Sequence, residues 1–526
     1  MNPAVGYDRF DKLLARIEAG VRASAPAALG YFEQIVAERL LQRIVELGLH
    51  PSMRAAALRH EAGKAPSLPA GDAEELGGLR IESGRVSLTA GAWLRSVGEF
   101  FVQWSRAFYV MGRALFAPRE SAVPLPATLL LGVGGEDLVA GGSDARFVEF
   151  CRKGPLPVLV EAKHVLVERA APLASADPQL VAYVRHPLFE AARLRRPTVR
   201  EIGRFLIGQM RAAGAFVRLA VAHPLSAILA RDLAFHALVA DLDRRGLVQA
   251  IVITNSHYHV QPLWMRALPE RKFTTHLAWY SQNSIPFMYA RDGVRSYLPN
   301  HRHICVDDIW VWTPGYAAYL RERGARGRIH VVGPILWYLA PPVPPPRERL
   351  QIVVFDVTPQ VPSFALQVGL SYNYYRASNV AQFVADIVQA RDEVERALGQ
   401  RVAVVLKHKR TPSAHHDPGY VASIRELAQE GRITLVSPET DVYRLIQASS
   451  LTVVIPYSSP AYVSGQLGVP AIYYDPEGEL VPSYEAASKI EFAAGRAALK
   501  AAMLRLLEDS ATLPLRSGQS RAAVRS

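Results

Sequence analysis

The chain has 526 residues, half of them hydrophobic and 21% charged, with a formal net charge of +12. This length exceeds what one hydrophobic core supports and predicts two or more domains, and the composition excludes a disordered chain. With only two cysteines, Cys151 and Cys305, a disulfide framework or a cysteine-based zinc site is not expected. The basic excess is spread along the chain without a nucleic-acid-binding signature, so we expect no nucleic-acid partner.

The first 20 residues carry charges every few positions and lack the apolar centre of a signal peptide. No run of about 18 uninterrupted apolar residues occurs, which argues against a membrane span. These two observations predict a cytoplasmic protein.

Residues 1–122 read as a helical region, because apolar residues recur there at three- and four-residue spacing. The segments with this spacing are FDKLLARIEAGV, YFEQIVAERLLQRIVELGL and the aromatic-rich GAWLRSVGEFFVQWSRAFYVMGRALF. We interpret the aromatic stripe of the last segment as helix packing rather than a cofactor site.

From residue 123 to 340, short runs rich in Val, Ile and Leu alternate with helical segments, as in parallel βαβ units. The expected strands are TLLLGVG, LPVLVEA, QAIVITNS, FTTHLAWYS, HICVDDIWVWT and RIHVVGP. This range is therefore predicted to form a first Rossmann-like domain.

The proline-rich stretch at 341–349 cannot continue a helix or a central strand, and we interpret it as a semi-rigid linker. A second alternating series follows at 350–480 and predicts a second parallel sheet. Residues 481–526 are expected to be a helix with a frayed tail. The fold class expected is thus α/β, with two Rossmann-like doubly wound parallel-sheet domains facing a cleft and a helical region before them.

Polar residues follow the strands of the second domain, where ligands of open parallel sheets bind. Asp356 ends the first strand, and Lys407, His408, Lys409 and Arg410 end the second. Ser458 and Ser459 lie between a later strand and a helix, where backbone N–H groups suit a phosphate. Each feature alone fits a cap or a solvated face, but together they favour a phosphate site.

The segment DVYRLIQASSLTVVIPYSSPAYVSGQLGVPAIYYDP resembles the donor-binding half of a GT-B glycosyltransferase, the two-domain nucleotide-sugar enzyme fold. The architecture of residues 125–510 and the motifs of residues 350–476 carry the resemblance. The strand-end His408 and the serine turn look closest to bacterial transferases that use CMP-activated Kdo or sialic acid. The segments WYSQNSIPF, VWTPGY and HVVGPILWYL make the chain similar to surface carbohydrate biosynthesis proteins.

Two departures accompany the resemblance. Lys409, not proline, follows His408, whereas the CMP-sugar enzymes have a His-Pro motif. The helix after the serine turn carries only Ser464 and Gln466 where the common GT-B pattern has a ribose-binding Glu, which disfavours UDP and GDP donors.

The first domain would hold the acceptor. Glu136 and Asp137 lie in a Gly-rich turn and are rivals of Asp356 for the role of base or nucleophile, with a plain surface turn equally open. Polar residues after two further strands, suited to sugar hydroxyls, are Asn255, His257, Gln282 and Asn283. His257 and His259 lack a third ligand with suitable spacing, so no metal is expected. Of Asp307 and Asp308, one is expected to be buried and paired and the other to face the cleft.

The resemblance implies a metal-independent glycosyltransferase, without a cofactor, that moves a sugar from a nucleotide-sugar donor to a surface glycan acceptor such as lipopolysaccharide, O-antigen or capsule. The donor expected is a CMP-linked acidic sugar, and a lipid-linked acceptor implies peripheral contact with the cytoplasmic face of the inner membrane. Three alternatives stay open: a nucleotide-sugar epimerase, a CDP-alditol phosphotransferase, and a non-catalytic glycan-assembly subunit.

Overall fold

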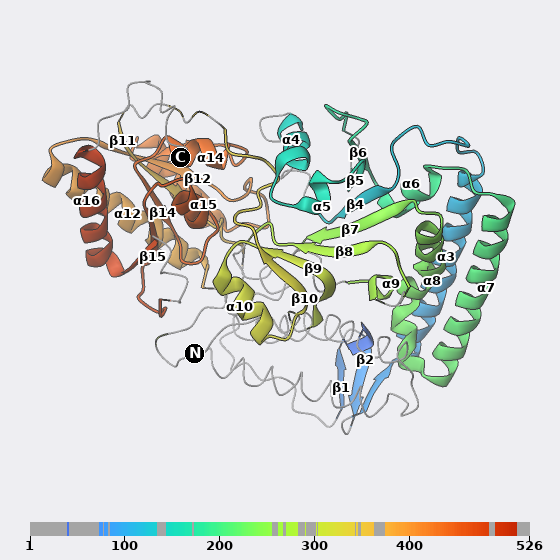
Figure 1. The fold of residues 1–526 in the computed structure, drawn as a ribbon. Helices are drawn as coiled ribbons and strands as arrows, with labels where there is room; N and C mark the ends of the chain where they lie inside the picture. The colour runs from blue at the N-terminus through green and yellow to red at the C-terminus, as the bar shows by residue number, and fades with distance from the viewer. Residues whose placement is uncertain are drawn as a thin grey trace. The chain divides into compact units, whose positions relative to one another are not determined.

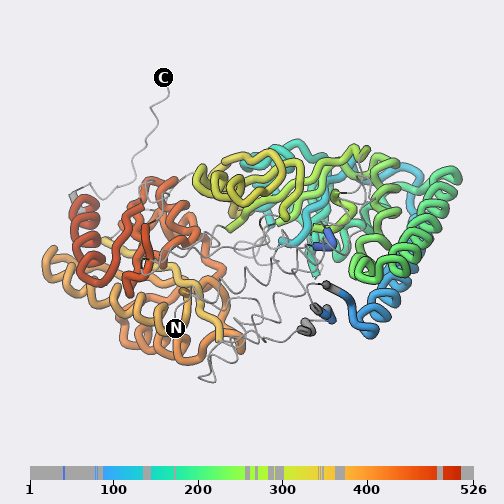
Figure 2. The backbone as a smooth tube through the Cα atoms, turned by 90° about the horizontal axis from the view of Figure 1, so that it is seen from below, coloured from blue at the N-terminus to red at the C-terminus, as the bar shows by residue number. Residues whose placement is uncertain are grey.

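A computed structural model gives the architecture of the chain (Figures 1 and 2). The structure describes residues 39–41, 73–76, 78–82, 85–133, 144–170, 173–254, 261–266, 270–281, 290, 301, 303–341, 343, 345, 349–361, 374–482 and 490–512. The chain divides into two compact units. Unit 1 comprises Met1–Tyr280 and Pro299–Tyr338, and unit 2 comprises Ser281–Leu298 and Leu339–Ser526.

The N-terminal part of unit 1 is not wholly helical, contrary to the sequence-based expectation. Strands β1 (Ala73–Leu76), β2 (Leu79–Glu82) and β3 (Arg85–Leu88) form a three-stranded antiparallel sheet. These four-residue strands are too short for alternation to stand out in the sequence. Helix α3 (Ala90–Ala114) confirms the predicted aromatic-rich helix, and the Thr89 hydroxyl caps it by accepting from the Ala92 N–H.

Unit 1 is built on a seven-stranded parallel sheet with the order β10-β9-β8-β7-β4-β5-β6. Its strands are β4 (Ala127–Leu131), β5 (Val165–Glu168), β6 (Val181–Val184), β7 (Val248–Thr254), β8 (Thr274–Ala278), β9 (Cys305–Val311) and β10 (Arg326–Val331). The middle strands β4 and β7 are almost wholly buried, as expected where helices cover both faces of a sheet.

The helices of unit 1 connect these strands. They are α4 (Ala145–Lys153), α5 (Pro157–Val160), α6 (Pro187–Arg193), α7 (Val199–Ala222), the 3₁₀ helix η1 (Pro224–Leu229), α8 (Ala230–Arg244), α9 (Leu263–Arg266) and α10 (Pro314–Glu322). A capping box starts α7, where the Thr198 hydroxyl accepts from the Glu201 N–H and the Glu201 carboxylate accepts from the Thr198 N–H.

The prediction of a strand at LPVLVEA is wrong. Pro157 opens the short helix α5 there, and the strand of this region, β5, begins only at Val165. A proline at the first helical position lacks the N–H that a central strand needs, so the apolar run forms a helical turn instead.

Unit 2 contains a six-stranded parallel sheet with the order β13-β12-β11-β14-β15-β16. Its strands are β11 (Leu350–Phe355), β12 (Val402–Lys407), β13 (Thr434–Val436), β14 (Leu451–Val454), β15 (Ala471–Asp475) and β16 (Ile490–Ala494). Strand β11 lies between β12 and β14, with Phe355 in register with Lys407 and Val454. The three loops that follow these strands therefore leave one edge of the sheet.

The helices of unit 2 form two groups. They are α12 (Ala377–Leu398), α13 (Pro418–Gln429), α14 (Val442–Gln447), α15 (Pro460–Gln466) and α16 (Gly495–Thr512). Helix α12 packs against α13 and α16, whereas α14 packs against α15. The prediction of two parallel-sheet α/β domains with flanking helices is confirmed.

The C-terminal segment differs from the expected single helix, because residues 490–494 form strand β16 at the edge of the sheet and only then does α16 begin. Gly495, with a positive φ of 75°, makes the turn from strand to helix. The segment IEFAA has no clear helical or strand period, and pairing with β15 decides for the strand.

Candidate functional site

Asp356 directly follows β11 and is buried, with 2% of its surface exposed. Its Oδ2 is 2.6 Å from Nδ1 of His408 and accepts from the Tyr420 hydroxyl at 2.7 Å. Its Oδ1 accepts from the Lys409 N–H at 2.8 Å and from the Thr358 hydroxyl at 2.9 Å. Both oxygens thus carry two hydrogen bonds, which compensates the burial of the charge.

This network exists because the sheet places two loops side by side. Phe355 and Lys407 pair at the ends of β11 and β12, so the next residue of β11 meets the loop after β12. Tyr420 reaches the same carboxylate from the first turn of α13, whose N-cap is Asp417. Burial and the negative charge of Asp356 raise the pKa of the Tyr420 hydroxyl well above its usual value, which keeps it a donor.

His408 is therefore held in one orientation. With Nδ1 bonded to the carboxylate, Nε2 is the ring nitrogen left for a ligand, and the structure gives Nε2 no hydrogen-bond partner among the described residues. The imidazole is 3% exposed and lies 6.1 Å, centroid to centroid, from the Tyr420 ring. A carboxylate that orients an imidazole in this way is a common arrangement of functional histidines.

The first part of the loop after β11 is joined to the end of the loop after β12. The Val361 N–H donates to the His415 carbonyl at 3.0 Å, and the Asp417 N–H donates to the Pro359 carbonyl at 2.9 Å. An isolated β-bridge links Gln360 to His416. Burial lowers the pKa of His416, whose Nδ1 accepts from the Ser413 N–H at 3.0 Å, so this histidine stays neutral and structural.

The other predicted cations lie at the end of β12 or in the loop that follows it. Lys407 is the last residue of β12 and is buried, while Lys409 and Arg410 are exposed. The Arg410 N–H donates to the Thr358 hydroxyl at 3.3 Å, which ties the basic segment to the β11 loop.

The serine turn follows β14, the other neighbour of β11, so Ser458 and Ser459 leave the same edge of the sheet as His408. Ser459 occupies the N-cap position of α15, but its side chain makes no capping hydrogen bond. Ser458 is 3% exposed, and among the described residues its hydroxyl has no hydrogen-bond partner. Helix capping therefore does not account for either hydroxyl.

Two residues at this edge adopt a backbone conformation that is rare for non-glycine residues. Thr358 has a φ of 45°, and Tyr457, immediately before the serine turn, has a φ of 64°. Such positions cost free energy and concentrate at ligand sites. Both are held by hydrogen bonds, from the Thr358 hydroxyl to Asp356 and from the Tyr457 hydroxyl to the Val481 carbonyl at 2.9 Å.

Sequence reasoning missed three residues of this edge: Thr358, Tyr420 and Ser281. The Ser281 hydroxyl, also within unit 2, lies 3.4 Å from the Ser459 hydroxyl. Ser281 directly precedes Gln282, a predicted site residue, so the polar SQNS stretch could have indicated that Ser281 belongs to the site. Tyr420 lies 64 residues from Asp356, inside a helix, and no sequence signal marks it.

Ser464 of α15 is buried and donates to the Val469 carbonyl at 3.0 Å, and its hydroxyl lies 2.8 Å from the Thr452 hydroxyl. Its hydroxyl therefore holds the helix on the sheet and does not replace the ribose-binding Glu of the common GT-B pattern.

In unit 1, both predicted aspartates are paired. Asp307 accepts from the two terminal nitrogens of Arg271 at 2.8 and 2.9 Å. Asp308 is buried and pairs with Arg328 at 2.9 Å and with His330 at 2.7 Å. The other predicted residues of the acceptor side and the rival acids lie outside the described residues: Glu136, Asp137, Asn255, His257, His259, Gln282 and Asn283. Within the described residues no group of three His, Cys, Asp or Glu side chains could hold a metal ion.

Residues 214–503 match the family described as "Polysaccharide biosynthesis PFTS motif protein". The chain belongs to this family. The match covers the C-terminal third of unit 1 and nearly all of unit 2, including every residue of the edge around Asp356. No curated protein matches the chain.

Several solved structures are similar at low sequence identity. Sucrose-phosphate synthase from Thermosynechococcus elongatus has 14% identity and a TM-score of 0.42, covering 74% of this chain and 91% of its own. The wall teichoic acid polymerase TagF has 11% identity and a TM-score of 0.39, and the match covers 80% of this chain and 90% of the TagF chain. The lipopolysaccharide outer core galactosyltransferase WaaB has 11% identity and a TM-score of 0.35, and the match covers 73% of this chain and 90% of the WaaB chain. Similarities at this level carry no information about substrate.

Proposed function

We propose that this chain is a glycosyltransferase that takes a sugar from a nucleotide-sugar donor and adds it to a surface polysaccharide. The observation that carries the proposal is the buried Asp356–His408 pair at the edge of the unit 2 sheet, next to the serine turn. The family description, polysaccharide biosynthesis, supplies the pathway but no reaction.

The donor phosphate would lie beyond β11, between the loop after β12 and the serine turn. In its protonated form, His408 would donate through Nε2 to a phosphate oxygen, and the exposed Arg410 would add a second positive charge. Ser458 and Ser459 would donate from the opposite side. Charge that develops on the departing phosphate would meet these donors already in place, so no metal ion and no cofactor are required.

Asp356 would act through His408 rather than on the sugar. A nucleophile or base needs a lone pair facing the substrate, and this carboxylate already accepts four hydrogen bonds in a buried position. We therefore assign it a positioning role. The base would come from unit 1, where Glu136 and Asp137 remain the candidates, and Asn255, His257, Gln282 and Asn283 would bind the acceptor.

The donor proposed is a CMP-linked acidic sugar. The described part of α15 presents no acid that could hold a ribose in the manner of UDP- and GDP-sugar enzymes, and Ser464 faces the core. The acceptor would be a glycan of the lipopolysaccharide, O-antigen or capsule, assembled in the cytoplasm at the inner membrane.

Nucleotide binding tests this proposal. A thermal-shift panel of CMP, CDP, UDP and GDP should show stabilisation by CMP, because a ligand that binds the folded state raises its melting temperature. His408→Ala and Ser458→Ala/Ser459→Ala should each weaken binding by roughly 10- to 100-fold, the effect of losing a charge-assisted hydrogen bond. His415→Ala, an exposed histidine in the same loop, is the matched control and should bind normally.

The same panel separates the alternatives. A CDP-alditol phosphotransferase needs the same histidine and serine turn and would prefer CDP, an epimerase would prefer UDP, and an assembly subunit would bind none. Equal nucleotide affinity in well-folded His408→Ala and in the wild type would overturn the placement of the donor.

A further inference from the structure

Exposed apolar side chains gather on two helices of unit 1. Of the fifteen exposed large hydrophobic residues in the described part of the chain, ten lie on α3 or α7. They are Leu94, Phe101, Val102 and Tyr109 on α3, and Val199, Leu206, Ile207, Met210, Val217 and Val221 on α7. Isolated exposed hydrophobic residues are ordinary, but a concentration on neighbouring helices indicates an interaction surface.

On α7 these residues form a continuous stripe. Ile207, Met210, Val217 and Val221 recur at spacings of three, seven and four residues, which places them on one side of a helix. Met210 is 63% and Val221 71% exposed. The opposite side, with Phe205 and Phe216, is buried.

A row of arginines borders the apolar stripe. Arg204, Arg211 and Arg218 recur every seven residues on α7 and are exposed, and α3 carries Arg95, Arg106 and Arg113 in a similar position beside its own stripe. With Arg200, the two helices hold seven arginines against two acids, Glu99 and Glu201. Among the described residues none of the seven forms a salt bridge, whereas Glu201 pairs with Arg195.

The two helices are fixed to each other and to α8. Phe100 and Phe216 stack with ring centroids 4.0 Å apart, and the indole N–H groups of Trp93 and Trp104 donate to the carbonyls of Ala220 and Gln209. Figures 1 and 2 show α3 and α7 together at one end of unit 1.

Among the described helices, α7 is long and apolar enough to cross a membrane by length and composition. One side of it, however, belongs to the core of unit 1, in a cluster with residues of α3, η1 and α8. A helix with one side committed to a protein core can lie along a membrane but is not free to span it.

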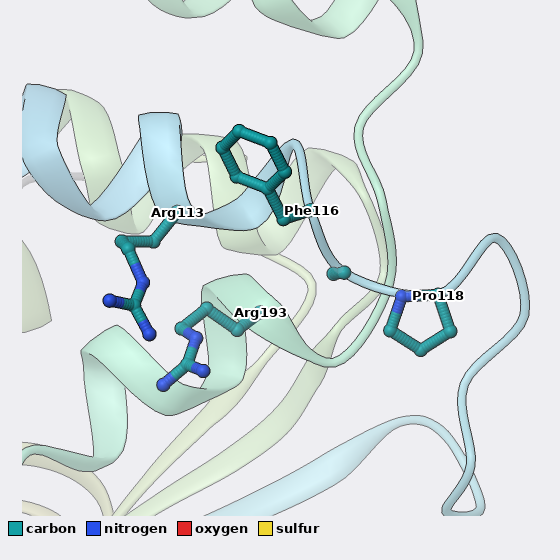
Figure 3. A pocket seen from close by; sticks show the side chains of 5 residues that line it. Arg113, Phe116, Pro118 and Arg193 are labelled. Atoms are coloured by element: carbon teal, nitrogen blue, oxygen red, sulfur yellow. The ribbon is translucent and has the colours of Figure 1, made fainter.

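The end of α3 adds a positively charged hollow. Arg113, Phe116, Ala117, Pro118 and Arg193 line a cavity of about 440 Å³, and Figure 3 shows the two guanidinium groups directed to the same side. Phe116, which also lines the cavity, is 87% exposed, and its ring points away from the two guanidinium groups (Figure 3). Arg193 also pairs with the Glu190 carboxylate at 2.8 Å, whereas Arg113 forms no salt bridge among the described residues, so the Arg113 guanidinium is the group placed to meet a lipid phosphate.

We propose that the outer surface of α3 and α7 docks unit 1 onto a bilayer that contains anionic phospholipid. The apolar stripes would enter the boundary between headgroups and acyl chains, and the arginine rows would contact lipid phosphates. This surface would bind lipid without any nucleotide, so the proposal can be tested independently of the transfer reaction.

Flotation with vesicles tests it directly. The wild-type chain should float with phosphatidylcholine vesicles that contain 30% phosphatidylglycerol and should remain in solution with phosphatidylcholine alone. Arg211→Gln/Arg218→Gln should lower the partition coefficient roughly 30-fold, since a basic residue near an anionic surface contributes about fivefold. Met210→Ser/Val217→Ser should lower it by roughly tenfold or more through lost apolar burial.

Matched variants elsewhere control for general loss of charge and apolar surface. Arg401→Gln/Arg425→Gln changes two exposed arginines of unit 2, and Val160→Ser/Val343→Ser changes two exposed valines, and both should float like the wild type. Unchanged melting temperatures show that each variant is folded. Absence of wild-type flotation with anionic vesicles, or flotation of the α7 variants equal to the wild type, overturns the proposal. Concentration-dependent dimerisation that Met210→Ser/Val217→Ser abolishes, without vesicle binding, would instead make the surface a self-association site.

Discussion

Nδ1 of His408 lies 2.6 Å from the buried Oδ2 of Asp356, although 52 residues separate them in the chain. Because this contact holds the ring so that Nε2 is left for the ligand, its loss should lower turnover in protein that still folds. We expect Asp356→Asn to lower kcat by roughly 10- to 100-fold, the size of a lost charge-assisted contact, with a smaller change in KM.

The readout that separates positioning from a structural role is ¹⁵N NMR of the His408 ring. The wild type should show one dominant form with Nδ1 protonated, and Asp356→Asn should show a mixture. Asp356→Glu, which keeps the charge, should recover part of the activity. Near-normal turnover in Asp356→Asn together with loss in Glu136→Gln or Asp137→Asn would assign the chemistry to unit 1 alone.

Tyr420→Phe should destabilise unit 2 by about 1.5–3 kcal/mol, because it removes a hydroxyl that donates to a buried carboxylate. The hydrogen bond is 2.7 Å long and both residues are 2% exposed, so its loss leaves a buried carboxylate with one donor fewer. Chemical denaturation measures the effect. Tyr109→Phe, at a 66% exposed position on α3, is the control and should change little, and equal stability of the two variants would contradict this role of Tyr420.

Gln209→Met should stabilise unit 1. The Gln209 side chain is fully buried on α7, and among the described residues neither its amide nitrogen nor its oxygen has a hydrogen-bond partner. Removing such a buried polar group while keeping the side-chain volume should raise the free energy of unfolding by about 1–3 kcal/mol. Calorimetry of the variant is the measurement, with the exposed Gln429→Met as a control. A lower melting temperature for Gln209→Met would show that the amide has a role of its own.

His276 makes the stability of unit 1 depend on pH. Burial lowers its pKa from 6.5 to about 4, so the folded state holds the imidazole neutral while the unfolded state binds a proton below about pH 6.5. Stability should therefore be intact above pH 6.5 and fall as the pH drops towards 4. The loss at pH 4.5 attributable to this histidine is on the order of 2 kcal/mol.

Denaturation at pH 7.5 and pH 4.5 gives the free energy of unfolding lost on acidification. The contribution of His276 is the difference between this loss in the wild type and in His276→Asn. The variant should lose less stability over this interval than the wild type. His276 accepts from the Trp310 indole N–H at 3.3 Å, and an amide oxygen can take over that contact. The same pH dependence in both proteins would place the titrating group elsewhere.

The elements of unit 2 follow closely from the sequence, because its buried strands are continuous apolar runs separated by helices with clear caps such as Asp417 and Asp441. The short strands β1 to β3 and β16 do not, since tertiary pairing decides segments whose local pattern is ambiguous. The convergence of Asp356, His408 and the serine turn on one edge could be expected from parallel topology alone. Which atoms meet could not, because the Tyr420 and Thr358 contacts depend on the conformation of long loops.

The antiparallel pairing between the loops after β11 and β12 has a consequence for how this family can diversify. Residues 359–361 and 415–417 share backbone hydrogen bonds and a bridge, so an insertion within either of these two segments would disturb the other. Insertions within these two segments would thus have to arise together, whereas among the described residues no such bridge joins them to the loop after β14. Differences in ligand preference among relatives should accordingly arise from sequence changes in the serine turn. Changes in the two paired segments should instead occur together.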